Sequence, residues 1–132
     1  MNSLASATYV SAGTIDVSAV DPMDVLIELE VTPGTVSSDK GVYLFVKTSL
    51  DNTDFSTGPE SGTTTTDEPD LNLIGFLPCN TNSTLQRKTF SVSAALGYVP
   101  PYMKVIVKNA TGAALAASGH EVNYSTVVGN VA

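Results

Sequence analysis

The chain has 132 residues, enough for one domain with its own core, and carries 13 acidic against 6 basic residues, a formal net charge of −7. This charge argues against nucleic acid and anionic membranes as partners, because both are bound by clustered Lys and Arg. Charged residues make up only 14% of the chain and hydrophobic ones 42%, the opposite of the balance found in disordered proteins.

The first 20 residues are rich in Ser, Ala and Thr and contain two short alternating pieces, Thr8–Val10 and Thr14–Val17. We expect residues 1–20 either to form a first strand or to be an arm that lies on a neighbouring subunit. No basic residue precedes Lys40, so the positively charged start of a secretory signal is missing. The longest apolar runs are also too short to cross a membrane.

Alternation of apolar and polar side chains is clearest in Asp24–Val31, which predicts a strand with one buried face. Val42–Leu50 is apolar on both faces, which indicates a central strand or one covered by a partner. The segment Asp51–Asp70 is rich in Thr, Gly, Pro and acids and predicts one long loop. Loops of this length are often functional or ordered by a partner.

Further strands are expected at Leu71–Leu77, Leu85–Val92, Met103–Lys108 and Ala113–Tyr124, with a turn at Ala94–Tyr98. No stretch has the apolar spacing and caps of a helix of several turns. Seven or eight short strands predict an all-β fold, an antiparallel β-sandwich or jelly roll. We expect residues 21–132 to form this sandwich as a single domain, preceded by the arm or strand of residues 1–20.

Few residues offer reactive chemistry. His120 and Cys79 are the only histidine and the only cysteine, and no nucleophile-elbow motif surrounds a serine. We expect His120 in a turn, a buried and inert Cys79, no enzyme activity and no cofactor. The carboxylates of the long loop leave two interpretations open, a bridging cation and a hydrated acidic surface, and the second is favoured because they fit no calcium-loop pattern.

Lys104, Ile106 and Lys108 are expected to share one face of their strand. If that strand lies beside Asp24–Val31, Glu28 and Glu30 could pair with the lysines across the sheet. The face is then either an ordinary charged surface or a contact patch with exposed apolar anchors rimmed by charge. The candidate partner contacts in the second case are Leu26, Tyr43, Phe45, Lys104, Ile106 and Lys108.

Two segments resemble a group of small structural proteins of tailed bacteriophages. One is SLDNTDF, Ser49–Phe55, followed by Gly58-Pro59, and the other is PPYMKVIVKNATGAALAASG, which begins at Pro100 and ends at Gly119. The resemblance implies a virion component, and a capsid decoration (cement) protein is the role we expect. It carries no catalytic motif, so no active-site residue is implied.

The resemblance further implies a β-sandwich present in many copies on the outside of an assembled head, often as trimers at local threefold positions. Its partners would be the major capsid protein or other virion proteins, and it would reach the capsid surface during assembly in the host cytoplasm. We expect residues 1–20 and Asp51–Asp70 to make the contacts. The alternatives are a tail, neck or baseplate component and, less favoured in a chain without Trp, a carbohydrate-binding module.

Overall fold

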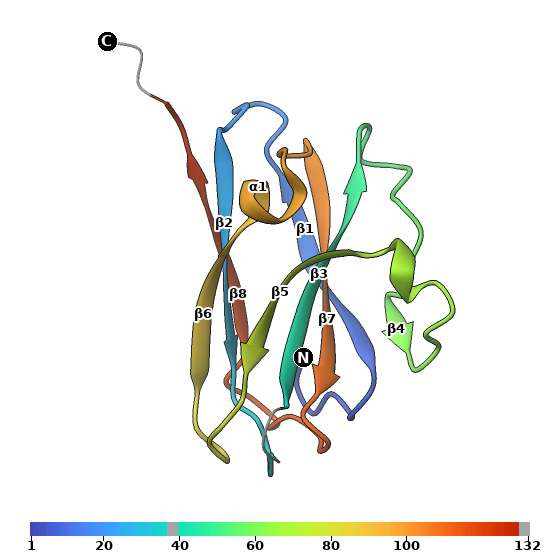
Figure 1. Cartoon of the computed structure of the whole chain (residues 1–132), viewed down its shortest axis with the longest axis vertical. Coiled ribbons are helices and arrows are strands. Elements are labelled where there is room, and N and C mark those ends of the chain that lie inside the picture. The colour runs from blue at the N-terminus through green and yellow to red at the C-terminus, as the bar shows by residue number, and fades with distance from the viewer. Residues whose placement is uncertain (37–39, 130–132) are drawn as a thin grey trace.

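The computed structural model describes residues 1–36 and 40–129, which form two antiparallel sheets packed face to face (Figure 1). One sheet has five strands in the order β4-β1-β7-β3-β5, and the other has three in the order β6-β2-β8. The elements are β1 (Tyr9–Asp16), β2 (Asp24–Val31), β3 (Gly41–Ser49), β4 (Ser61–Gly62), a 3-10 turn (Glu68–Asp70), β5 (Asn72–Pro78), β6 (Gln86–Ser91), α1 (Val92–Leu96), β7 (Tyr102–Ala110) and β8 (Glu121–Val127). The predicted all-β sandwich of about eight strands is confirmed.

The core lies between the sheets and follows from the period-2 alternation. In β2 every second side chain, from Val25 to Val31, is fully buried, and the intervening side chains face outward. The inner faces of β3 and β7 supply the opposite half of the core: Val42, Leu44, Val46, Met103, Val105 and Val107. Apolar burial of this kind is the main force that holds the two sheets together.

The first residues of the chain belong to the sandwich. Strand β1 lies between β4 and β7 and buries Tyr9 and Ile15. The segment before it is held at the end of the sandwich, since Ser3 N donates to Ala116 O and Ala7 N to Asn109 O. Of the two interpretations of residues 1–20, the structure has the strand, and deleting these residues would remove part of a sheet.

Two local expectations were wrong. Helix α1 occupies part of the expected turn at Ala94–Tyr98 and begins before it. The Ser91 hydroxyl caps the start of this helix by accepting from Ala94 N, and Gly97 ends it with φ +81°. The expected strand Ala113–Tyr124 begins only at Glu121. Its small residues form a loop instead, because Leu115 is buried and Leu115 N donates to Leu4 O rather than to a neighbouring strand.

The neighbours of β7 are β1 and β3, whereas β2 lies in the other sheet. The expected pairing of Glu28 and Glu30 with the lysines of β7 is therefore wrong, and Glu30 instead accepts a hydrogen bond from Arg87 of β6. No helix in the described part of the chain is long and apolar enough to cross a membrane.

Candidate functional site: the outer face of the five-stranded sheet

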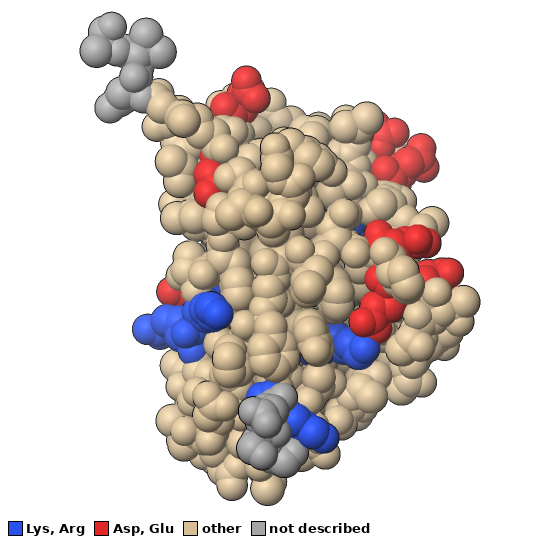
Figure 2. Space-filling view, in the orientation of Figure 1, with Lys and Arg blue, Asp and Glu red and all other residues tan. Residues whose placement is uncertain are grey.

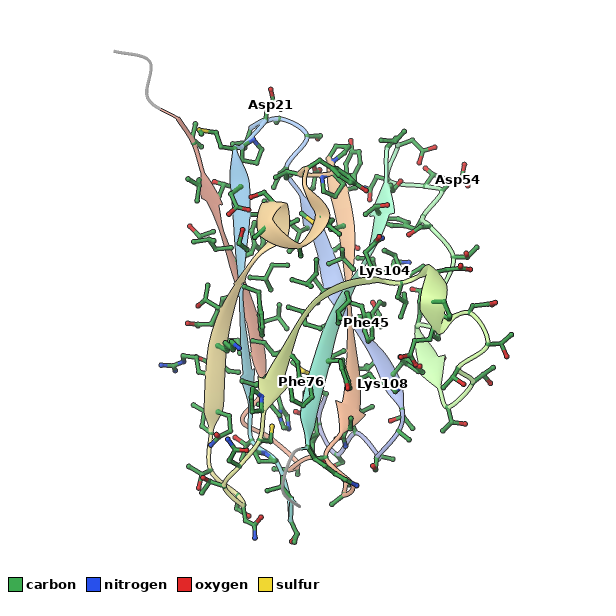
Figure 3. All side chains as sticks on the ribbon, viewed as in Figure 1. Asp21, Phe45, Asp54, Phe76, Lys104 and Lys108 are labelled. Carbon is green, nitrogen blue, oxygen red and sulfur yellow. The ribbon has the colours of Figure 1, made fainter. Side chains whose placement is uncertain are left out.

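Five of the six predicted contact residues come together on the outer face of the five-stranded sheet. The register of β3 against β7 places Tyr43 opposite Lys108 and Phe45 opposite Ile106. Lys104 follows on the same face of β7, and Figure 3 shows it with Phe45 and Lys108 along this sheet. Leu26 is the exception, because it lies on the outer face of the three-stranded sheet, opposite Ser125 of β8.

This outer face is covered by the chain's own long loop. Phe45 and Ile106 are 5% and 0% exposed, and with Tyr9 and Leu71 they form a small apolar cluster separate from the main core. Phe45 and Ile106 are thus not exposed anchors for a partner. Tyr43 is half-buried beside the cluster, with its ring centroid 6.0 Å from that of Phe45. The apolar outer face of β3 is explained by this cover within the chain.

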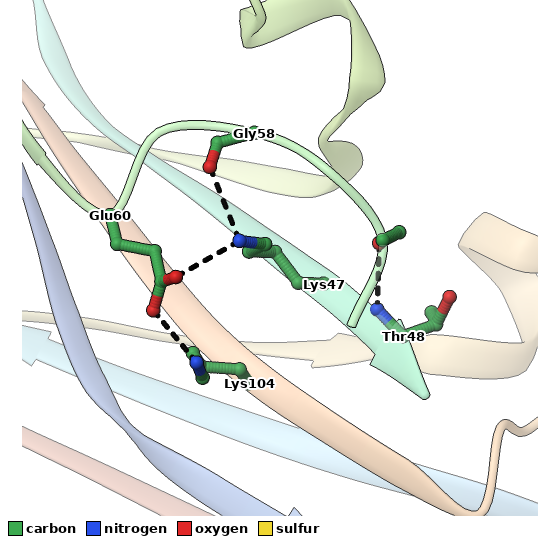
Figure 4. A network of polar contacts seen from close by, with 6 residues as sticks. Lys47, Thr48, Gly58, Glu60 and Lys104 are labelled. Carbon is green, nitrogen blue, oxygen red and sulfur yellow. Dashed lines mark hydrogen bonds and ion pairs between the residues drawn. The ribbon is translucent and has the colours of Figure 1, made fainter. Parts of the chain in front are cut away.

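Glu60 fastens the loop to two strands (Figure 4). One carboxylate oxygen lies 3.0 Å from Lys47 Nζ on β3, and the other lies 2.8 Å from Lys104 Nζ on β7. Lys47 is a buried residue and also donates to the Gly58 carbonyl at 3.2 Å. The hydrogen bonds from Lys104 and Lys47 hold the pKa of Glu60 below its usual range. The carboxylate therefore stays charged and keeps the loop in place.

Glu68 makes a second attachment farther along the loop. Its carboxylate accepts hydrogen bonds from Lys108 Nζ, at 2.6 Å, and from the Tyr9 hydroxyl. Burial opposes the charge on Glu68, but the hydrogen bonds from Lys108 and Tyr9 outweigh it and lower its pKa. Burial and the neighbouring carboxylate also raise the pKa of Tyr9. Both lysines proposed as partner contacts are thus paired with acids of their own chain.

Leu26 lines a shallow hollow of about 250 Å³ on the three-stranded sheet, together with Glu28, Thr89, Asn123, Tyr124 and Ser125. The side chain is half-buried among its strand neighbours. Nothing in this hollow brings Leu26 close to the other five candidates, so the six residues do not form one patch. Sequence alternation showed which residues face outward but not which sheet each belongs to.

The two residues with the most versatile chemistry also have structural roles. His120 Nδ1 accepts from Thr32 N at 3.3 Å, and its Nε2 lies 2.7 Å from Ala116 O, so the ring joins two loops. Cys79 is fully buried, and burial raises its pKa to about 11. Within residues 1–36 and 40–129, no three His, Cys, Asp or Glu side chains are grouped to hold a metal ion.

Comparison with known proteins gives no match: no protein-family model, no curated protein and no solved structure is similar to this chain. The role of the molecule must therefore be inferred from its own residues and geometry.

Proposed function

We propose that this chain is a structural protein of a tailed bacteriophage virion, specifically a capsid decoration protein that binds the assembled head. The supporting observation is that its reactive side chains fix its own loops. Glu60 and Glu68 hold the long loop on the sheet, and His120 joins the loops at Thr32 and Ala116. In this proposal the molecule acts through rigid shape and surface contact.

The two segments that resemble phage proteins have matching structural roles. Ser49–Asp54 forms a turn in which Asp51 Oδ1 accepts from Thr53 N and Asp54 N, each at 2.9 Å. In the other segment, Asn109 is buried near the end of β7, and its side-chain amide donates to Leu4 O and Ala113 O. Both segments thus stiffen the ends of the sandwich, as expected for a protein that must present a fixed surface to many identical neighbours.

The proposed mechanism is linkage between binding and shell stability. A protein that binds only the assembled shell stabilises that state by RT ln(1 + L/Kd) per site, where L is the concentration of the free protein. A trimer or other oligomer would add its separate weak contacts through avidity. The partners are the major capsid protein or other virion proteins, and the place of action is the capsid surface. Nucleic acid and membranes are not partners in this proposal, given the net charge of −7.

A cryo-EM map of purified particles, combined with mass spectrometry of their proteins, tests the proposal. We expect density for an eight-stranded sandwich on the outside of the head. Density on the tail, neck or baseplate would establish the alternative virion role. Failure to find the chain in any particle would refute both.

A further inference from the structure

One end of the sandwich carries a surface that the sequence did not reveal. Strands β1, β3 and β8 end there, and β2 and β7 begin there, since Tyr102 pairs with both Asp16 and Ser49 and Asp24 pairs with Val127. Four segments cover this end: residues 17–23, 50–54, 97–101 and 127–129. We call their exposed part, together with Asp16, the apical surface. It lies at the top of the molecule in Figure 1.

Exposed apolar side chains gather on the apical surface. Nine large hydrophobic residues are exposed in the described part of the chain, and six of them belong to these four segments: Val20, Met23, Leu50, Tyr98, Val127 and Val128. Leu50 is 87% exposed and Met23 is 68% exposed. Isolated exposed hydrophobic residues need no explanation, but their concentration at one end marks an interaction surface.

Two neighbouring hollows lie at this end. Leu50, Asp54, Tyr98 and Pro100 line one hollow of about 290 Å³, and Val17, Asp21, Pro22, Val99 and Pro101 line a second of about 330 Å³. The Tyr98–Pro101 segment thus contributes to both hollows. On the far side, Met23 N donates to Val127 O at 2.8 Å, which brings the end of β8 to the same surface.

The tips that present these side chains are held in place. Leu50 sits in the turn fixed by Asp51, whose carboxylate also accepts from the Ser49 hydroxyl. Asp16 accepts from both the backbone and the hydroxyl of Ser18 at the start of the neighbouring loop. Little conformational entropy would be lost when such preformed tips bind, which favours their use as anchors.

The rim of the surface is acidic. Asp16, Asp21, Asp51 and Asp54 are exposed there, and none of the four segments contains Lys or Arg. Asp21 and Asp54 lie at the same end in Figure 3, and in Figure 2 acidic side chains line the top of the molecule while most basic ones lie in its lower half. Hydrogen bonds from Ser18 lower the pKa of Asp16, and those from Asp54 and Thr53 lower the pKa of Asp51.

We propose that the apical surface docks onto a different protein whose own surface offers apolar contacts rimmed by Lys and Arg. Charge complementarity selects this occupant, because opposite charges on the rim favour encounter and orientation. A second copy of this chain in the same pose would set four carboxylates against four, and nucleic acid and anionic lipid would meet the same repulsion. The identity of the partner rests on the proposed function, under which it is the outer surface of the head.

Site-specific photo-cross-linking tests the proposal in the cells and particles in which the chain is naturally made. Benzoylphenylalanine replaces Tyr98, which is 54% exposed on the apical surface, or Leu73 of β5, a matched control that is 51% exposed outside it. We expect position 98 to cross-link to a Lys- and Arg-rich peptide of another protein, and position 73 to give at least tenfold less. Mainly self-cross-links, a non-basic target or equal yields at both positions would overturn the inference.

Charge variants give an independent readout. Asp21→Asn with Asp54→Asn removes two rim charges without touching the hydrogen bonds made by Asp16 and Asp51, and Asp67→Asn in the long loop is the control. We expect the rim variant to lower the cross-link yield from position 98 several-fold and to weaken its dependence on salt. Equal yields from the rim variant and the control would count against a basic partner.

The outcomes separate the two proposals. A cross-link to a basic surface of a protein outside the virion would leave the apical inference standing and end the proposed function. Density on the head without cross-links from position 98 would support the proposed function and overturn the apical inference.

Discussion

The side-chain amide of Asn109 donates a 2.9 Å hydrogen bond to the backbone carbonyl of Leu4, which lies 105 positions earlier in the chain. Asn109 is fully buried and also donates to Ala113 O, while its own oxygen accepts from the backbone and hydroxyl of Thr111. One side chain thus joins the first residues, the end of β7 and the loop before β8. The segment Lys108–Gly112 (KNATG) therefore stabilises the fold.

Replacing Asn109 with Ala should destabilise the fold by about 3 kcal/mol, because it removes the hydrogen bonds to Leu4 and Ala113 and leaves the buried N–H of Thr111 without its acceptor. Asn123→Ala is the matched control, since Asn123 is exposed on β8 and only reaches Glu28 at 3.5 Å. Urea unfolding followed by tyrosine fluorescence measures both. Similar stabilities for the two variants would show that the side chain of Asn109 does not stabilise the fold.

Replacing Glu60 with Gln should weaken the attachment of the long loop and lower the free energy of unfolding by about 1 kcal/mol. The loss is larger than for an ordinary surface pair because Lys47 is largely buried and would lose the carboxylate of Glu60 as its partner. Arg87→Gln, which breaks the exposed pair with Glu30, should change stability by less than about 0.5 kcal/mol. Limited proteolysis should cut residues 56–70 faster only in the Glu60 variant.

Acid should release the same loop before the sandwich unfolds. The pKa values of Glu60 and Glu68 are lowered in the folded chain, so their contribution is present above the usual Glu pKa of 4.5 and is lost as pH falls through their folded-state values. Hydrogen exchange of residues 56–70 should therefore accelerate below pH 4.5 beyond its intrinsic change. The double variant Glu60→Gln, Glu68→Gln should have a loop that is already open and shows no such transition.

Cys79 should resist alkylation in the folded protein. Its side chain is fully buried, and burial raises its pKa to about 11. At mildly alkaline pH the reagent therefore cannot reach the sulfur, and the thiol is not ionised to the reactive thiolate. Iodoacetamide labelling, followed by mass spectrometry, should be at least about a hundredfold slower in buffer than in denaturant, since it requires local opening. Comparable rates in the two conditions would show that the site is open to solvent.

Sequence reasoning succeeded where side-chain alternation alone determines the structure. Strand β2 was predicted with its observed bounds, because four buried residues alternate with outward-facing ones. Alternation assigns a face but not a neighbour, and β7 consequently was not predicted to lie between β1 and β3. The segment after Ala113 was ambiguous, since hydrogen bonds from Leu115 N to Leu4 O and from Ala116 N to Thr32 O hold it rather than strand pairing.

The attachment of the long loop to the sheet and the apical surface could not be predicted from sequence for a different reason. Glu68 meets Lys108 across 40 positions, and no local pattern indicates a contact between a loop and a distant strand. The apical residues are apolar side chains from four separate segments of the chain, so only the topology brings them together. The available signal was an apolar residue inside an otherwise polar turn, such as Leu50 before Asp51.

A close contact between the two sheets gives the last prediction. A Cβ added to Gly75 of β5 would lie 2.2 Å from Cδ1 of the Phe90 ring on β6, so Gly75→Ala must displace a ring that is only 8% exposed. Overpacking of this kind should lower the free energy of unfolding by about 1–3 kcal/mol. Phe90→Leu removes part of the obstructing ring. The double variant should therefore lose less free energy of unfolding than the two single variants lose in sum. Urea unfolding of the four proteins measures this coupling. Strict additivity would mean that Phe90 does not occupy the space above Gly75.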